Sequence, residues 1–548
     1  MRSGERLAVI DLGSNSFRLV VFMAADGWWK RTDEIYEPVR IGEGLAASGR
    51  LGEEPIERAL AALDVFAHFC RAAGLTQSSG LRAPARGSPR SPAAGAGAVD
   101  AVATSAIRDA ENAADFLARA CTLTKLPIRV LSREDEARYG YLAAVNSTTL
   151  TNGCVLDLGG GSLQLVRVAG RLARESGSWR VGTVRMSERF LPPNGPAKRK
   201  QLEELREHVA AQLSDATWLA DGAGEQRGGR LVGIGGTVRN LAAAAQRAAG
   251  LPSNGVQGMV VTREALDELV SRLASLPAAE RSTVPGIKPA RADLILAGAL
   301  VVQGVLQAGG FAALETTEAG LREGVFFERL LGGRGAGSRS AAADRPPLFE
   351  DPRRTSVMNL AARYNVDAAH TRHVAALALG MFDELARLGL HDGDAREREL
   401  LWAACMLHDI GMSVDYDDHH KHSRYLILNG GLPGFSPIEV ATIAQAARYH
   451  RKGMPDPGPL AALFEPDDEA RLDRCAVLLR LAEDLERSRD QLVRDVQITL
   501  LEDGSAGGAG AVELRVIADG EAAVPRWAAS RETELFARAF HRELSVAA

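Results

Sequence analysis

Two short glycine-rich stretches of this chain place an aspartate where a strand is expected to end. Residues 155–166 read VLDLGGGSLQLV, with Asp157 directly before the glycines. Three glycines and a serine follow it: Gly159, Gly160, Gly161 and Ser162. Glycine loses the most backbone freedom on folding, so three in a row indicate that something approaches the bare backbone closely. Exposed N–H groups bind anions, and a nearby carboxylate can hold the metal that accompanies phosphate. A tight hairpin turn without a ligand is the alternative interpretation.

The same pattern occurs near the N-terminus. Residues 11–22, DLGSNSFRLVVF, align without gaps with residues 157–168, DLGGGSLQLVRV, and six of the twelve positions are identical. Each copy follows an apolar strand and leads into another, which predicts a hairpin with an aspartate at the end of its first strand. The second turn contributes Asp11, Ser14, Asn15 and Ser16. An internal duplication of this kind predicts two facing lobes that grip a phosphate chain and its metal.

The elements between these turns alternate between strand and helix. Residues 99–103 and 128–131 read as strands, and the segment SREDEARYGYLAAV reads as a helix in which Ser132 and Asp135 match a capping box. A further strand and helix are expected from residue 231, in LVGIGGTVRNLAAAA. This alternation is typical of an α/β architecture.

Length and composition restrict the function further. A chain of 548 residues is expected to form about three or four domains, and its net charge of −5 argues against a nonspecific nucleic-acid binder. A polyanionic ligand must therefore be held by a local site. The five scattered cysteines indicate buried thiols in a reducing compartment, and no stretch of 18 uninterrupted apolar residues occurs. We therefore expect a cytoplasmic protein that contacts neither membrane nor specific nucleic acid.

Six motifs occur in this order along residues 11–325: DLGSNSFRLV, ATSAIRDAEN, LSREDEAR, VLDLGGGS, GIGGT and EAGLREGV. In this order they resemble the exopolyphosphatase and guanosine pentaphosphate phosphohydrolase (Ppx/GppA) family, which has the actin, sugar-kinase and Hsp70-like ATPase fold. The resemblance implies Mg²⁺-dependent, processive removal of the terminal phosphate of inorganic polyphosphate. Conversion of guanosine pentaphosphate at the same site is the alternative, since both reactions cleave a terminal phosphoanhydride. A homodimer is also implied by the resemblance alone.

The resemblance assigns roles to individual residues. Glu136 matches the catalytic glutamate that orients and deprotonates the attacking water, although an acidic residue at a helix start also has a purely structural explanation. Asp157 resembles the metal-supporting aspartate and Asp11 mirrors it, while Arg108 would brace the transferring group. A further anion site is expected at the start of a helix, formed by Gly235, Gly236 and Thr237. An ATP-dependent kinase or chaperone of the same fold is the competing function, and the motifs SNS and EAR favour the phosphatase branch.

The second half of the chain reads as helical. His408 and Asp409, with His373 upstream and Asp484 downstream, match the ligand order of HD-type metal phosphohydrolases, and His422 and His450 are possible extra ligands. A second divalent metal or hydrolytic activity is one interpretation, and a structural or polyphosphate-clamping domain is the other.

The predicted domain plan is as follows: lobe I at 1–127 with an insertion at 78–98, lobe II at 128–311, a returning strand and helix of lobe I at 312–331, a linker at 332–347, a helical HD-type domain at 348–495 and a small β-rich module at 496–548.

Overall fold

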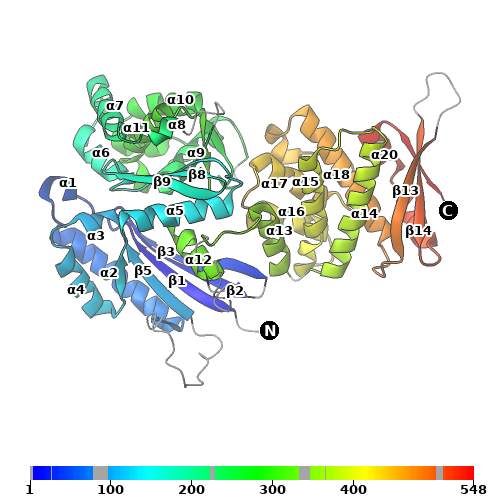
Figure 1. Ribbon diagram of the computed structural model, residues 1–548, viewed down its shortest axis with the longest axis horizontal. Helices are drawn as coiled ribbons and strands as arrows, with labels where there is room; N and C mark the ends of the chain where they lie inside the picture. The colour runs from blue at the N-terminus through cyan, green and yellow to red at the C-terminus, as the bar shows by residue number, and fades with distance from the viewer. Residues whose placement is uncertain are drawn as a thin grey trace. The chain divides into compact units, whose positions relative to one another are not determined.

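A computed structural model describes residues 4–25, 27–77, 97–221, 229–252, 254–332, 346–364, 366–501 and 510–547. The chain divides into two compact units, Met1–Pro352 and Arg353–Ala548 (Figure 1). Most of the predicted insertion (78–96) and of the predicted linker (333–345) lies outside the described residues. Residues 97 and 98, which are predicted as the end of the insertion, begin a strand instead.

The first unit contains two sheets built around the same three antiparallel strands. In the first sheet, three antiparallel strands are followed by parallel ones, in the order β3-β2-β1-β5-β4, and β6 also pairs with β5. Its strands are β1 (Glu5–Leu12), β2 (Phe17–Ala25), β3 (Trp28–Glu37), β4 (Leu75–Gln77), β5 (Gly97–Ala103) and β6 (Ile128–Val130).

The second sheet has the order β11-β12-β10-β7-β8-β9, in which β7, β8 and β9 are antiparallel and β10 and β12 continue the sheet in parallel, while the edge strand β11 is antiparallel to β12. Its strands are β7 (Gly153–Leu158), β8 (Leu163–Ala169), β9 (Leu172–Trp179), β10 (Arg230–Ile234), β11 (Val260–Thr262) and β12 (Ala313–Thr316). Leu12 pairs with Phe17 in the first hairpin, and Leu158 pairs with Leu163 in the second. The sequence repeat therefore corresponds to two hairpins of identical register.

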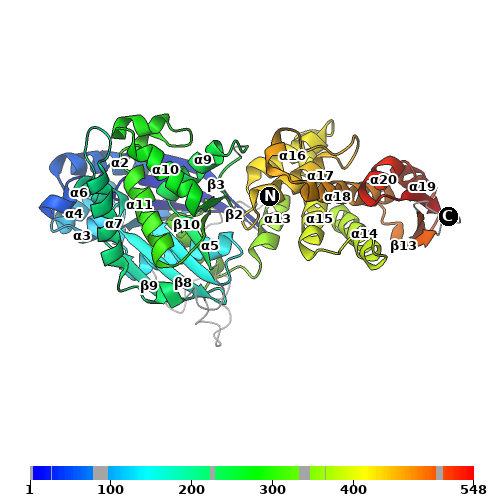
Figure 2. The same ribbon diagram turned by 90° about the horizontal axis from the view of Figure 1, so that it is seen from above.

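Two helices lie between the sheets, and other helices cover the outer faces. Helix α5 (Arg133–Ser147) packs on the second sheet and against α12 (Leu321–Gly332), which packs on β1 and β2. One apolar cluster joins both sheets to these two helices. The outer face of the first sheet is covered by α2 (Glu53–Ala72) and α4 (Ala113–Thr124). On the second sheet, α9 (Gly236–Ala248), α10 (Arg263–Ala274) and α11 (Ile295–Ala308) do the same (Figure 2).

This topology moves two of the predicted lobe boundaries. Strand β6 falls in the predicted lobe II, but it pairs with β5 in the first sheet. Strand β12 falls in the part predicted to return to lobe I, but it pairs with β10 and β11 in the second sheet, so only α12 returns to lobe I. Short strands of this kind carry no sequence signal for the sheet they join, because partner choice depends on long-range pairing.

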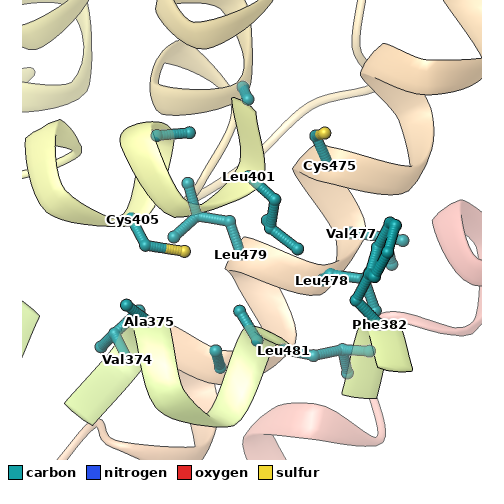
Figure 3. Packing of buried hydrophobic residues seen from close by; sticks show 14 of the residues in the cluster. Val374, Ala375, Phe382, Leu401, Cys405, Cys475, Val477, Leu478, Leu479 and Leu481 are labelled. Atoms are coloured by element: carbon teal, nitrogen blue, oxygen red, sulfur yellow. The ribbon is translucent and has the colours of Figure 1, made fainter. Parts of the chain in front are cut away.

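The second unit is a helical domain that carries a three-stranded sheet. Its main helices are α13 (Pro352–Arg363), α14 (Ala368–Arg387), α15 (Ala395–Leu407), α16 (His419–Gly430), α17 (Pro437–Arg448) and α18 (Pro466–Leu485). Leu401 of α15, Phe382 of α14 and Leu479 of α18 belong to its core, which Figure 3 shows from close by.

The C-terminal segment is part of this domain rather than a separate module. It contains β13 (Val493–Leu501), β14 (Ala511–Ala518), α19 (Ala523–Ala529), α20 (Thr533–Phe540) and β15 (Glu543–Ala547). Strand β13 begins three residues before the predicted boundary, and Val493, Leu514 and Phe536 share one apolar cluster with the helices. The core is therefore continuous across the predicted boundary at residue 496.

Two further features bear on the sequence-based expectations. Among the described residues, no helix has both the length and the apolar character needed to cross a membrane. All five cysteines are free, and four of them are buried, whereas Cys121 is exposed on α4 and is not the core residue that the sequence predicts.

Candidate active site

The two duplicated turns face each other in the first unit. A Cβ on Gly160 would lie 3.0 Å from Cβ of Ser14, and one on Gly161 would lie 2.6 Å from Oγ of Ser105. Gly182 presses on the same turn from behind, since its Cβ would lie 2.3 Å from the carbonyl carbon of Gly161. Glycine is therefore required in this turn because other segments of the protein approach its backbone closely, whether or not a ligand binds. The Gly159 N–H donates to the Ser162 carbonyl and closes the hairpin.

A cavity of about 130 Å³ opens beside these turns, and both lobes line it. All but two of the predicted phosphate-binding and metal residues border it: Asp11, Ser14, Asn15, Ser16, Asp157, Gly159, Gly160, Ser162, Gly235 and Gly236. Gly161 and Thr237 do not. Gly161 lies against Ser105, and Thr237 is buried with its Oγ1 lacking a hydrogen-bond partner in the described part of the chain.

Glu136 lies in the first turn of α5 and points into the cavity. The predicted capping box is confirmed, since the Asp135 N–H donates to Ser132 Oγ at 3.0 Å and the Ser132 N–H donates to Asp135 Oδ2 at 3.3 Å. This cap holds the start of the helix, and with it the carboxylate of Glu136, at the edge of the cavity.

Two donors fix one oxygen of the Glu136 carboxylate. Nη1 of Arg108, in α3 (Ser105–Asp109), donates to Oε2 at 2.5 Å, and Nε2 of Gln164 donates to the same oxygen at 3.2 Å. No described residue hydrogen-bonds to Oε1, so this oxygen is left to accept a proton from water. Burial raises the pKa of Glu136 to about 7, and the guanidinium of Arg108 opposes the rise.

The two repeat aspartates share a desolvated environment. Burial, followed by the charge of Asp11, raises the pKa of Asp157 to about 7, and burial also raises the pKa of Asp11. Asp11 Oδ2 lies 3.5 Å from Nη1 of Arg322, whereas Asp157 has no ion pair among the described residues. A half-buried carboxylate without an ion-pair partner, next to a second carboxylate, suits a hard divalent cation. The residues present therefore fit Mg²⁺, with Asp157 as the better ligand of the two.

Four arginines outside the predicted set of site residues also line the cavity: Arg18, Arg239, Arg291 and Arg322. Burial lowers the pKa of Arg239 to about 10, with the charges of Arg322 and Arg18 contributing. Clustered cations in a partly buried site repel one another unless an anion lies between them. Arg18 and Gln164 occupy the same position in the two repeat copies, which is the signal that could have identified both residues.

In the second unit, the structure brings together only part of the predicted metal set. His408, Asp409 and His450 lie in one buried cluster, but His373, His422 and Asp484 do not join it. His373 Nε2 lies 2.8 Å from the Val493 carbonyl, and Asp484 pairs with Arg487. The cluster is completed instead by His370, His419 and Glu483, which are neighbours of the predicted residues on the same helices.

The fold and the cavity define an α/β protein in which two duplicated hairpin turns, two aspartates and four arginines line one cavity. Models of the Ppx/GppA phosphatase family match residues 93–332, and of its domain III residues 353–517. Together they cover more than half of the chain, and the protein belongs to this phosphatase family. The start of the domain III match coincides with the start of the second structural unit.

Solved structures resemble part of the chain. A Ppx/GppA protein from Aquifex aeolicus is 28% identical, with a TM-score of 0.48, over 60% of this chain and 99% of its own. An exopolyphosphatase from Cytophaga hutchinsonii is 20% identical, with a TM-score of 0.52, over 60% of this chain and 98% of its own. The second comparison shows a shared fold, which is the predicted actin-like arrangement of duplicated lobes.

Proposed function

We propose that the first unit is a Mg²⁺-dependent exopolyphosphatase, which hydrolyses the terminal phosphoanhydride of inorganic polyphosphate and releases orthophosphate. One observation carries this proposal. The buried carboxylate of Glu136 borders the cavity between the two turns, and its Oε2 is occupied by Arg108 and Gln164 while its Oε1 is not. That is the arrangement a general base for water requires.

Different residues of the cavity bind the phosphates, accept the proton of the attacking water and hold the metal. Ser14, Ser162 and the backbone of the two turns donate hydrogen bonds to the terminal phosphoryl group, and the cavity arginines hold the phosphates behind it. Glu136 Oε1 accepts a proton as the water oxygen bonds to the terminal phosphorus. The bond from that phosphorus to the bridging oxygen breaks, and its electron pair stays on the shortened chain. Mg²⁺, held by Asp157 with Asp11 nearby, would neutralise charge on the phosphoryl oxygens.

The lining favours polyphosphate over a nucleotide. None of the described residues that line the cavity, or the adjoining hollow that shares Ser14 and Asn15 with it, is aromatic. A purine base is usually held by stacking, whereas a row of phosphates needs only cations and hydrogen-bond donors. The four cavity arginines supply those cations although the chain as a whole is acidic.

Glu136→Gln tests the proposal, with Glu134→Gln as the control, because Glu134 is exposed in the same helical turn. We expect Glu136→Gln to lower phosphate release from long-chain polyphosphate by about 10²- to 10⁴-fold while binding of the chain persists. Glu134→Gln should retain full activity. Running both variants with guanosine pentaphosphate compares the two substrates directly. Undiminished turnover by Glu136→Gln would refute its role as the base.

A further inference from the structure

The second unit holds a cluster of histidine and acidic side chains that the proposed hydrolysis does not use. Its members lie on five helices or within two residues of their ends: His370 on α14, His408 and Asp409 just after α15, His419 on α16, His450 just after α17 and Glu483 on α18. The four histidines and Asp409 are at most 5% exposed. Burying so many ionisable groups in a helical core is unfavourable unless they hold one another or a ligand.

The backbone fixes which ring nitrogen of three histidines faces the cluster. Nδ1 of His408 lies 2.7 Å from the Cys405 carbonyl, Nδ1 of His419 lies 2.9 Å from the Tyr416 carbonyl, and Nδ1 of His450 lies 2.7 Å from the Ala447 carbonyl. A carbonyl only accepts, so each Nδ1 carries the hydrogen and each neutral ring presents the Nε2 lone pair inward. This second contact is the one that orients metal-ligating histidines.

Asp409 stands between these lone pairs. Its Oδ1 lies 3.3 Å from Nε2 of His419, 3.7 Å from Nε2 of His408 and 3.8 Å from Nε2 of His450. Oδ1 nevertheless has no hydrogen-bond partner within the described part of the chain, and neither does His408 Nε2. Nε2 of His419 and Nε2 of His450 are 3.1 Å apart. Acceptors that face acceptors in a buried space are the donor set that a cation satisfies.

The ligand atoms form two overlapping groups. His370, His408 and Asp409 make one, and Asp409, His419 and His450 make the other, with the atoms of each group within 4.8 Å of one another. Two atoms that each lie about 2.1 Å from one ion are at most about 4.2 Å apart, so small side-chain adjustments suffice. Glu483 Oε2 extends the first group, at 3.0 Å from Nε2 of His370 and 3.2 Å from Nε2 of His408.

We propose that this cluster in the second unit binds two ions of a first-row transition metal. His370, His408 and Glu483 would hold one ion, His419 and His450 would hold the other, and Asp409 would contact both. Imidazole ligands select such metals over Mg²⁺, which prefers oxygen. Arg489 donates from Nη2 to Asp409 Oδ2 at 2.6 Å and is 39% exposed, so this side of the cluster reaches solvent. None of these residues lines the candidate site in the first unit.

Co²⁺ is the probe, because its visible absorption reports nitrogen ligands. The full chain is loaded with Co²⁺ and dialysed against excess Mg²⁺, which occupies an oxygen-only site, and retained cobalt is counted. We expect two Co²⁺ per chain and an imidazole-type spectrum. His408→Gln should lose the first ion and His419→Gln the second. His422→Gln, on the same helix as His419 but outside the cluster, should retain both.

Three outcomes would overturn the proposal: retention of fewer than two ions by the wild type, a spectrum without nitrogen ligation, or equal loss in His422→Gln and His419→Gln. A folding defect is recognised by thermal melting, in which Co²⁺ should raise the midpoint of the wild type and of His422→Gln. Activity on polyphosphate should persist in His408→Gln, which separates failure of this proposal from failure of the proposed function.

Discussion

Removal of the Arg108 side chain is the most informative change in the first unit, because Arg108 is the closest cation to the proposed base. Its Nη1 lies 2.5 Å from Glu136 Oε2, and its charge opposes the rise that burial imposes on the pKa of Glu136. A hydrogen bond to a charged group contributes about 1.5–3 kcal/mol. Since one pKa unit corresponds to about 1.4 kcal/mol, Arg108→Met should raise the pKa of Glu136 by about one to two units.

The assay is the pH dependence of kcat/KM for phosphate release. A base must be ionised, so the rate falls as pH drops through its pKa, and the acidic limb should move from about 7 in the wild type to about 8 or 9 in Arg108→Met. Activity at pH 7 then falls about 5- to 50-fold and recovers in alkaline buffer.

Arg129→Met serves as the matched control, since Arg129 contacts Tyr139 and Asp100 and makes no described contact with Glu136. Arg108 also donates to the Leu131 carbonyl, so a general loss of activity is expected from local disorder alone. Only the displaced limb reports the electrostatic role. An acidic limb that stays in place, or that moves to lower pH, would refute the reasoning.

Three further predictions concern stability. Burial holds the pKa of Asp157 at about 7, above its unfolded value, so the metal-free first unit should lose stability as pH rises from about 4 to 7. Asp157→Asn should make this decline shallower in denaturant titrations with chelator, while Glu136, whose pKa is also raised to about 7, maintains the rest; an unchanged pH slope would contradict the prediction. Gly182→Ala places a Cβ 2.3 Å from the Gly161 carbonyl carbon and should lower the free energy of unfolding by about 1–3 kcal/mol, measured by thermal melting. Gly332→Ala is the control: its Cβ would meet nothing within 4 Å, so the free energy of unfolding should not change. Phe382→Ala removes a side chain that is 1% exposed and should destabilise the second unit by about 3–5 kcal/mol; a loss below about 1 kcal/mol would show that this core can collapse around the gap.

Local sequence patterns determined much of the first unit. The duplicated Asp-Gly turns, the capping box at Ser132 and the position of Glu136 in the first helical turn follow from residue periodicity and turn chemistry over a few neighbouring residues. These features are predicted by the sequence and present in the fold. The closeness of the two turns is implied by the repeat, because two lobes that carry the same hairpin can pair about a shared cavity.

Tertiary packing decided which histidine and acidic residues join the buried cluster of the second unit and which arginines line the cavity of the first. Neighbouring residues of a helix are rotated by about 100° about its axis, and residues three apart by about 60°. Only the face that packs inward therefore distinguishes His370 from His373, His419 from His422, and Glu483 from Asp484. The cavity arginines come from β2, from α9 and α12 and from the segment before α11. Arg18 is marked by its position in the repeat, but the periodicity of the other three segments does not show that they converge. Long-range packing, rather than local propensity, therefore set the charge of the cavity and the ligands of the buried cluster.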